Sequence, residues 1–381
     1  MPDAWRYLDW NATAPMLPAA REALVAAIDA GLGNASSAHG PGRAARRLVD
    51  EARASVAALC GVAPGQVIFT SGATEALTLA VWSCGPGTIL GTALEHAALP
   101  AACDALPERA WHAIPFSPSE ALAAGATALA RRLTEAATTH RAPGLALLAA
   151  HNLTGLLLPV ADLAASLGAR PPEVRPRLIV DAAQRAGRLP LPPCPSDYLV
   201  VAAHKFGGPR GVAALVHAAD APVRPLFPGG GQERGRRGGT EAVPLIAAFG
   251  AAARWFLTHG EAEALRLQTL RDRLEGRLLT ELAGAAIVGW RAPRLPQTTA
   301  VTLPERFGDA ESTVRALSRA GLATSATSAC ATGSHLPAPS LLALGLTPAE
   351  ALRTLRLSLG HASTQADVDA AVDALKTIRN N

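Results

Sequence analysis

Lysine is rare in this chain, and one of its two lysines stands where chemistry is expected. Among 35 basic residues only Lys205 and Lys376 are lysines. Lys205 follows an apolar, β-branched run and precedes the glycine-rich segment 207–211. Arginine stays protonated, whereas a desolvated lysine amine can lose its proton and condense with an aldehyde. Lys205 therefore has the properties of a residue that anchors pyridoxal 5′-phosphate (PLP), and a surface lysine after a strand is the alternative.

The elements that must position Lys205 alternate between strands and helices. Apolar spacing predicts strands over 66–70, 88–91, 145–150, 178–180, 199–202 and 212–216, and helices over 18–30, 43–59 and 71–82. This alternation favours a wound, largely parallel sheet with a ligand crevice at the carboxyl ends of the strands. Polar residues lie at or just beyond those ends: Thr74, His96, Asn152, Asp181, Gln184, His204 and Lys205.

The last third of the chain has a different pattern, which predicts a second, smaller unit. We expect a bridging helix over 243–259, a further helix over 261–283, strands over 286–289 and 300–303, and helices over 312–320 and 365–378. The predicted fold class is α/β. A large domain over 16–255 contains the mainly parallel sheet, and a small α+β domain combines 1–15 with 256–381.

Composition and charge narrow the functional class. With 49% hydrophobic and 17% charged residues, the 381-residue chain is expected to be globular with a large core. A net charge of +4 without a lysine-rich tail, and only 4% aromatic residues, argue against direct nucleic-acid recognition. The absence of a signal-peptide-like or membrane-spanning apolar run predicts a cytoplasmic protein without membrane partners.

The five cysteines predict neither a disulfide framework nor a metal site, because they are odd in number, widely spaced and contain no CxxC pair. Cys60, Cys84, Cys103 and Cys194 are expected to be small buried apolar residues. Cys330 is different, because it lies in the segment 323–335, ATSATSACATGSH, whose small and polar residues do not have the pattern of a packed core.

Two further features fit a PLP anchor. The turn SGATEA at 71–76 lies between a predicted strand and helix, where free amides and the helix dipole can hold a phosphate. Asp181 ends a strand upstream of Lys205 and could pair with the pyridinium nitrogen of the cofactor. The turn alone is weak support, since any α/β protein contains such turns, and Asp181 could instead be a strand-end cap.

Ordered motifs across nearly the whole chain carry a family resemblance: YLDWNATAP, NASSAHGPGRAAR, FTSGATEA, LEHAAL, HNLTG, VDAAQ, AHKFGGPRG, GGGQERGRRGGTEAV, SACATGS and LRLSLG. Together they resemble the cysteine desulfurases, PLP enzymes of the class V aminotransferase family with the fold-type I architecture. The resemblance implies conversion of L-cysteine to L-alanine. The sulfur would pass to an enzyme cysteine as a persulfide, for iron–sulfur cluster assembly or tRNA thiolation.

The resemblance also implies roles for individual residues. Lys205 would anchor the cofactor and move the substrate α-proton, with His96 over the cofactor ring as a proton-transfer partner. The cofactor-binding residues would be Ala73, Thr74, His96, Asn152, Asp181, Gln184, His204 and Lys205, with Thr240 reaching the phosphate of the neighbouring subunit in a homodimer. The substrate-binding residues would be Asn34, Asn152 and Arg356. A structural salt bridge is the alternative for Arg356.

Cys330 would be the second reactive centre. Its thiolate would attack the substrate sulfur, because a thiol is a poor nucleophile. In the family this segment is a mobile loop, and the longer, SAC-containing form resembles the group whose loop delivers sulfur directly to an acceptor or scaffold protein. An inert exposed cysteine is the alternative.

Four positions depart from the family pattern. Leu153 stands where an acidic residue is common and is expected beside the cofactor ring, and Ala202 replaces a serine or threonine that touches the phosphate. His361 stands where arginine is common, and Ala35 replaces a proline. Loss of one hydroxyl contact costs about 1 kcal/mol, so we expect weaker cofactor retention.

These departures leave other functions open. One is another enzyme of the superfamily, such as a selenocysteine lyase, aminotransferase or epimerase. The other is a degenerate paralogue that acts as a binding scaffold.

Overall fold

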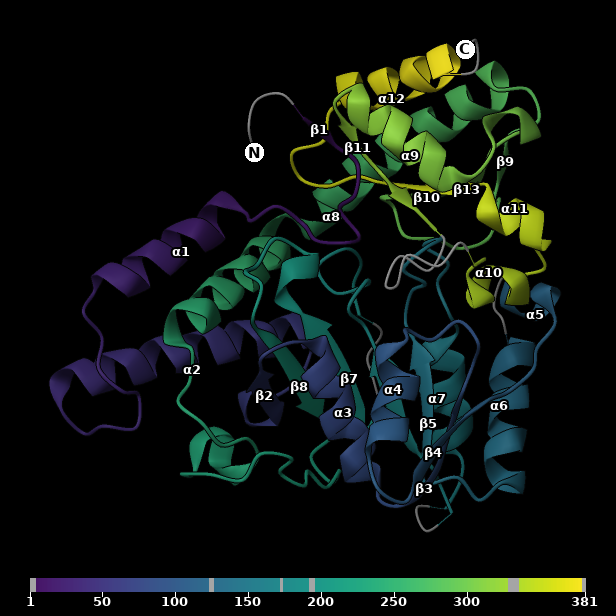
Figure 1. Ribbon diagram of the computed structural model, residues 1–381. Coiled ribbons are helices and arrows are strands. Elements are labelled where there is room, and N and C mark those ends of the chain that lie inside the picture. Colours follow the sequence, from purple (N-terminus) through teal and green to yellow (C-terminus); the bar gives the residue numbers. More distant parts are fainter. Residues whose placement is uncertain (1–4, 123–126, 172–173, 192–195, 328–335, 379–381) are drawn as a thin grey trace.

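A seven-stranded sheet forms the centre of the molecule (Figure 1). The computed structural model describes residues 5–122, 127–171, 174–191, 196–327 and 336–378, and Cys194 and Cys330 lie outside these ranges. The strand order is β2-β8-β7-β6-β5-β3-β4. The strands are β2 (Val67–Thr70), β3 (Gly87–Gly91), β4 (Arg109–Ala113), β5 (Gly144–Leu148), β6 (Arg177–Asp181), β7 (Tyr198–Ala202) and β8 (Ala213–His217).

The sheet is largely parallel, which confirms the predicted α/β fold class. Neighbours from β7 across to β4 pair in parallel, and β8 runs antiparallel to both β7 and β2. The edge strand β4 was not predicted from the sequence. Its residues, RAWHA, form no apolar run, and they alternate between half-buried and exposed along the strand.

Helices cover both faces of this sheet. Along β6, Leu178 and Val180 belong to one core and Ile179 to another, as expected when successive side chains point to opposite faces. The first core also contains residues of α2, α6, α7 and α8, and the second contains residues of α3 and α4. The helices up to α8 are α1 (Pro18–Asp29), α2 (Gly40–Cys60), α3 (Ala73–Cys84), α4 (Ala98–Ala105), α5 (Pro118–Leu122), α6 (Thr127–Thr139), α7 (Val160–Gly168) and α8 (Val243–Glu281).

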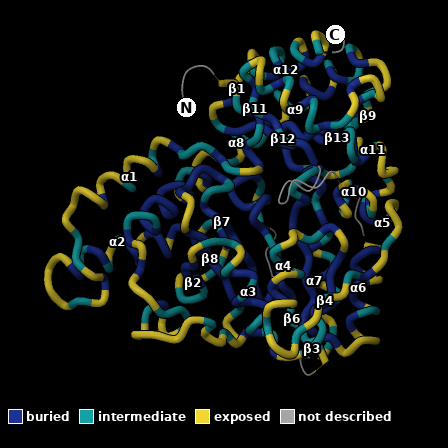
Figure 2. Tube along the Cα trace, in the orientation of Figure 1, coloured by how far each residue is buried: buried dark blue, intermediate teal, exposed yellow. Residues whose placement is uncertain are grey.

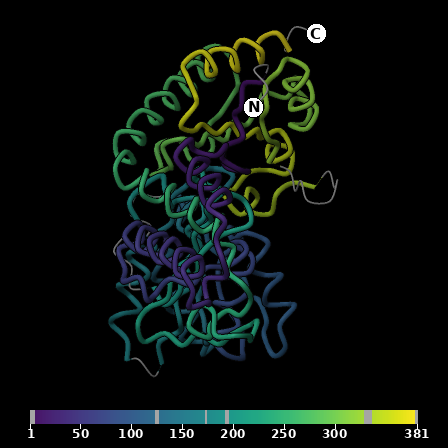
Figure 3. The backbone as a smooth tube through the Cα atoms, turned by 90° about the vertical axis from the view of Figure 1, so that its left-hand side faces the viewer, coloured from purple at the N-terminus to yellow at the C-terminus, as the bar shows by residue number. Residues whose placement is uncertain are grey.

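A smaller antiparallel sheet of order β12-β13-β10-β9 forms the second unit, and β1 pairs with β11 beside it. Its core is leucine-rich and includes Leu8 from the start of the chain. Figure 3 shows β1 and α12 at the same end of the molecule. The remaining elements are β1 (Arg6–Tyr7), β9 (Ala286–Ile287), β10 (Thr298–Thr302), α9 (Ala310–Arg319), β11 (Leu322–Ala323), β12 (Ser325–Ala326), α10 (Pro339–Ala343), α11 (Pro348–Leu352), β13 (Thr354–Ser358) and α12 (Gln365–Ile378).

The long helix α8 connects the two units. The sequence predicted one helix over 243–259 and another over 261–283, and this division is wrong because α8 continues through Gly260. A single glycine inside a helix costs about 1 kcal/mol relative to alanine, which packing at both ends of α8 can offset. Phe256 packs in the large-sheet core and Leu267 in the small-sheet core. The domain boundary predicted after residue 255 falls inside this helix and stays a prediction.

Burial follows the two sheets. Figure 2 shows the central strands almost entirely buried, whereas α1 projects with much of its surface exposed. Cys60 and Cys103 are buried as predicted, and Cys84 is half-buried. Within the described residues, no helix combines the length and the apolar character needed to cross a membrane.

Candidate active site

A cavity of about 490 Å³ lies at the carboxyl ends of β5, β6 and β7 and at the first turn of α3. Leu148 and Asp181 end their strands at its wall, as expected for the ligand crevice of an open α/β sheet. The predicted site residues that line the cavity are Ala73, Thr74, His96, Asn152, Asp181, Gln184, His204 and Lys205. The fold therefore brings residues from distant motifs into one space.

Lys205 lies in a short 3-10 turn directly after β7, and its amine points back to the N-terminal segment. The Nζ donates to the carbonyl oxygens of Asn11 at 2.8 Å and Ala12 at 3.1 Å. The pKa of Lys205 is lowered from 10.5 to about 8, chiefly by burial and also by the charge of Arg356, while the charge of Asp181 opposes the shift. A sizeable fraction of the amine is therefore neutral, and nucleophilic, near physiological pH.

This lowered pKa predicts how capture of an aldehyde by the cofactor-free protein depends on pH. Only the neutral amine attacks, so the capture rate should rise as pH increases, with its midpoint near the Lys205 pKa of about 8. Stopped-flow absorbance after mixing with PLP, from pH 6.5 to 9.5, measures this rate. A rate that climbs steadily to pH 9.5 without a midpoint near 8 would show that the amine is not desolvated.

Asp181 presents a carboxyl group to the same cavity. Its Oδ1 accepts a hydrogen bond from the Ala183 amide at 2.9 Å. Burial raises the pKa of Asp181, and the Ala183 amide and the positive charge of Lys205 only partly oppose this. A buried carboxylate is stabilised by a cationic partner. The position therefore suits a ligand that brings a protonated nitrogen.

His204 contributes a neutral imidazole beside Lys205. Its Nδ1 lies 3.2 Å from Oγ1 of Thr13. Burial lowers the pKa of His204 to about 4, and the charges of Lys205 and Arg210 act in the same direction. His204 can therefore bind an anion through a hydrogen bond but carries no charge at neutral pH.

The first turn of α3 forms the anion-binding side of the cavity. Its N-cap residue, Gly72, has no side chain to accept from the first amides, and Ala73 and Thr74 line the cavity. Unsatisfied amides and the helix dipole at such a terminus attract a phosphate. The SGATEA segment therefore forms the turn between a strand and the N-terminus of a helix, as its sequence predicted.

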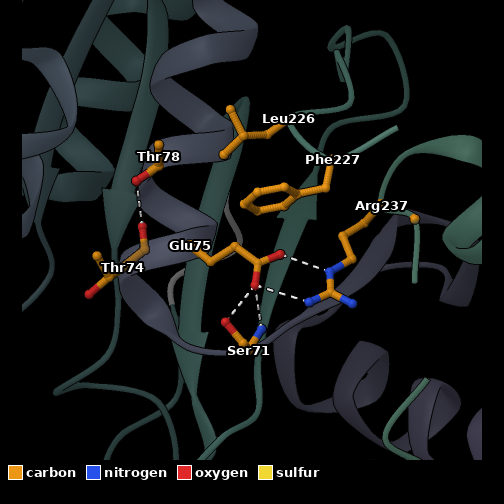
Figure 4. A pocket seen from close by; sticks show the side chains of 8 residues that line it. Ser71, Thr74, Glu75, Thr78, Leu226, Phe227 and Arg237 are labelled. Carbon is orange, nitrogen blue, oxygen red and sulfur yellow. Dashed lines mark hydrogen bonds and ion pairs between the residues drawn. The ribbon is translucent and has the colours of Figure 1, made fainter. Parts of the chain in front are cut away.

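Glu75 fixes this turn from its other side (Figure 4). Its carboxylate accepts from the amide of Ser71 at 2.7 Å and from the hydroxyl of Ser71 at 2.6 Å, and it pairs with Nε of Arg237 at 2.9 Å. Although burial raises it, the hydrogen bonds from Arg237 and Ser71 bring the pKa of Glu75 below its usual value. Arg237 thus neutralises an acidic group that would otherwise repel an anion at the same helix end.

Of the four positions that depart from the family pattern, Ala202 is the one nearest to this turn. It is fully buried in a cluster of small side chains with Ala183 and Ala213, and Ala73 packs against them. No hydroxyl is available at this position. The expectation of weaker cofactor retention stays a prediction.

Restoring a hydroxyl with Ala202→Ser should tighten cofactor binding, because serine adds one donor beside Ala73 with little extra volume. We expect the Kd for PLP to fall about fivefold, the equivalent of one hydrogen bond worth about 1 kcal/mol. Titration of cofactor-free protein with PLP measures it. Ala214→Ser is the control, since this buried residue belongs to the core on the opposite face and should give no gain. An unchanged Kd for Ala202→Ser would contradict the explanation.

Arg356 lies on β13, close to the cavity lining. Its Nη2 pairs with Oδ1 of Asp9 at 2.7 Å, and its Nη1 donates to the carbonyl of Asn152 at 3.2 Å. The structural salt bridge considered as an alternative is therefore present. However, the buried Nε has no hydrogen-bond partner among the described residues. Buried donors are rarely left unpaired, so the guanidinium keeps capacity for a ligand carboxylate.

Besides Arg356, two described residues of the predicted site do not line this cavity. Asn34 is exposed in the loop between α1 and α2, where its side chain accepts from the amide of Ser36 at 2.8 Å. Thr240 is also exposed, close after Arg237. Their predicted roles at the substrate and at the phosphate therefore stay predictions. Cys330 lies outside the described residues.

The other departures have structural roles. Leu153 is half-buried and packs against the large-sheet core, and it is not among the described residues that line the cavity, contrary to its expected place beside the cofactor. The ring of His361 packs edge-on against Trp10, with ring centroids 4.9 Å apart. Burial lowers the pKa of His361 to about 4, so it does not replace an arginine charge. Ala35 is buried, and its carbonyl accepts from Arg46.

Sequence reasoning missed two residues of the site. Asn11 is almost fully buried and binds the Lys205 amine through its carbonyl oxygen. Glu95 accepts from the hydroxyl of Thr92 at 2.8 Å, and burial raises its pKa to about 8 despite that bond, with Asp181 raising it further. Both lie in motifs that the sequence singled out, YLDWNATAP and LEHAAL. For Glu95 the unused signal was its position next to His96, whereas Asn11 has no neighbour in the sequence with an assigned role.

The donor set of the cavity fits PLP. A lysine amine with a lowered pKa suits its aldehyde, Asp181 suits its ring nitrogen, and the open end of α3 suits its phosphate. These three groups belong to three different sequence motifs.

Comparisons with known proteins agree with this geometry. The model of the aminotransferase class-V family matches residues 6–371. The chain is 39% identical to an IscS-like cysteine desulfurase of Mycobacterium tuberculosis, over 97% of this chain and 95% of that protein. It is 37% identical to a cysteine desulfurase of Cereibacter sphaeroides, over 98% and 95%. A solved NifS-like protein superposes with a TM-score of 0.86 at 27% identity, over 98% and 99%. The chain therefore belongs to the aminotransferase class-V family and, within it, to the cysteine desulfurases.

Proposed function

We propose that this chain is a cysteine desulfurase that converts L-cysteine to L-alanine and keeps the sulfur as a persulfide on Cys330. The observation that carries the proposal is the buried Lys205 amine, which shares one cavity with Asp181 and the open first turn of α3. Relatives named cysteine desulfurase match nearly the whole chain, so the similarity is not confined to one part of the fold.

Enzymes of this family depend on PLP, which when bound withdraws electrons from the substrate Cα. Lys205 would anchor it and Asp181 would hold its ring nitrogen. Ala73, Thr74 and His204 would bind its phosphate. The cavity-lining residues His96, Asn152 and Gln184 would contact its ring and phenolic oxygen.

Lys205 and His96 would carry protons. A base works best when its pKa lies near the working pH, and the Lys205 pKa of about 8 meets this condition for removing the substrate α-proton. Nδ1 of His96 accepts from the Ala98 amide at 3.1 Å. In the neutral ring the proton is then on Nε2, which can donate to a substrate group in the cavity.

The sulfur transfer balances without an external oxidant. The Cys330 thiolate would attack the substrate sulfur, so that an S–S bond forms as the Cβ–S bond breaks. The electron pair of the broken bond stays on the substrate carbon, which takes up a proton and becomes the methyl group of alanine. The persulfide sulfur would then pass to an acceptor or scaffold protein, and the SAC motif favours the longer type of cysteine loop.

Arg356 would bind the substrate carboxylate through the guanidinium N–H groups that Asp9 and Asn152 leave free. Asn34 would assist in substrate binding. A planar guanidinium fork matches a carboxylate in a way that a lysine does not.

A homodimer is part of the proposal. Thr240 and Asn34 are both exposed and lie outside the cavity of their own chain. Helix α1 projects from the rest of the molecule (Figure 2). Two of its apolar residues are exposed, Val25 at 40% and Ile28 at 61%. Burial of such a surface against a second copy would stabilise a dimer and let Thr240 reach the neighbouring phosphate.

The test is incubation of purified protein and PLP with L-cysteine, with alanine, sulfide and protein-bound persulfide measured together. Equal yields of alanine and of released plus bound sulfur are expected. Alanine without sulfur would indicate another superfamily enzyme. No visible absorbance from bound cofactor would indicate a scaffold and would exclude catalysis.

A further inference from the structure

We infer that Asn11 is a positioning residue that fixes the spacing between the two ends of the substrate site, the Lys205 amine and the Arg356 guanidinium. The inference deepens the proposed function and rests on it. Asn11 was assigned no role from the sequence. It is only 1% exposed, yet its side chain and both of its backbone polar groups form hydrogen bonds to residues far away in the chain.

On the amine side, the carbonyl oxygen of Asn11 accepts two hydrogen bonds from cavity residues. One comes from Nζ of Lys205 at 2.8 Å and the other from Nε2 of Gln184 at 3.0 Å. The orientation of this peptide group, together with the Ala12 carbonyl that follows it, therefore holds the free lysine amine. A shift of Asn11 would move both donors.

On the guanidinium side, Asn11 is tied to Arg356 by two separate routes. The carbonyl of Asn152 accepts from Nδ2 of Asn11 and from Nη1 of Arg356, each at 3.2 Å. The backbone amide of Asn11 donates to Oγ of Ser358 at 3.0 Å, two residues after Arg356 on β13. The same residue thus contacts the loop after β5 and the strand that carries the arginine.

The side-chain amide also joins the two units of the fold. Nδ2 donates to Oγ1 of Thr298 on β10 at 2.9 Å, and Nε2 of Gln297 donates to Oδ1 at 3.3 Å. All three side chains are buried, so an unmade bond here would leave an unpaired polar group. Asn11 is therefore held in one orientation by partners from the small sheet while its carbonyl faces the large-sheet cavity.

This arrangement bears on substrate selection. An amino acid presents an amine, which would take the place of the Lys205 amine at the cofactor, and a carboxylate, which would meet Arg356. The two ends fit together only if Lys205 and Arg356 are correctly spaced. Loss of that spacing should weaken the binding of ligands that have both an amine and a carboxylate. The binding of ligands that have only the amine should be little affected. A residue with a general role in stability would weaken both kinds of ligand equally.

The test compares L-alanine with ethylamine, which lacks the carboxylate, as ligands of the holoenzyme. Titration calorimetry gives the two Kd values without turnover, and the ratio of ethylamine Kd to L-alanine Kd measures carboxylate recognition. For Asn11→Ala we expect this ratio to fall about tenfold through weaker L-alanine binding, with the ethylamine Kd within about twofold of wild type. Thr298→Val should also lower this ratio, by a smaller factor.

The matched control is Thr302→Val on the same strand, β10. Its hydroxyl lies 3.0 Å from Oγ1 of Thr354, and among the described residues it forms no hydrogen bond with Asn11, Lys205 or Arg356, so the ratio should not change. If Asn11→Ala does not fold, Thr298→Val and Ser358→Ala carry the test. An unchanged ratio in the folded variants, with only a lower Tm, would overturn the inference. Wild type that binds both ligands equally would instead contradict the proposed function.

Discussion

Lys205→Ala will abolish alanine and sulfide production, to below about 10⁻⁴ of the wild-type rate, while the protein remains folded. The variant removes the only side-chain amine in the cavity, so the cofactor has no covalent anchor and the α-proton has no base. Stability should be retained, because burying a lysine amine is unfavourable and its removal relieves that cost. Steady-state assays, cofactor absorbance and Tm measure these three properties.

Lys376→Ala is the control for this result, because Lys376 is the only other lysine of the chain. Its amine pairs with Glu281 of α8 at 2.7 Å, and the Lys376 side chain is 46% exposed. This variant should keep full activity and the normal cofactor spectrum. Sulfide release by Lys205→Ala with Lys376 intact would contradict the assigned anchor.

Cys330→Ala will remove persulfide formation and sulfide release while cofactor binding stays intact. The proposed sulfur acceptor is the Cys330 thiolate, and no bond to the cofactor is lost when it is replaced. The cofactor spectrum should still respond to L-cysteine, because Lys205, Asp181 and Arg356 are unchanged. Mass spectrometry of the protein after a single turnover detects the persulfide, and absorbance follows the cofactor.

The cysteines that the structure describes provide the control. Burial raises the pKa of Cys103 to about 11 and raises that of the half-buried Cys84 even more, so neither forms a thiolate readily. Cys103→Ala should therefore keep sulfur transfer. Persulfide on another cysteine in Cys330→Ala, at the wild-type rate, would show that Cys330 is not the acceptor.

The sequence alone was sufficient to predict the wound α/β sheet and the family, and it singled out the residues that the cavity brings together. Lys205 and Asp181 could be placed because each directly follows a strand, and parallel strands bring their carboxyl ends to one edge. Local patterns also located α1, α3 and α12, since apolar spacing and end signals belong to neighbouring residues.

Only the tertiary structure determined the electrostatics and the supports of the site. The lowered pKa of Lys205 arises from burial and from Arg356, and its amine is held by Asn11, 194 positions away. The continuity of α8 depends on packing in two cores, which no local pattern contains. Burial and long-range hydrogen bonds depend on which distant segments meet. For that reason the sequence singled out Lys205, whereas the pKa of its amine and its neighbour Asn11 became visible only in the folded chain.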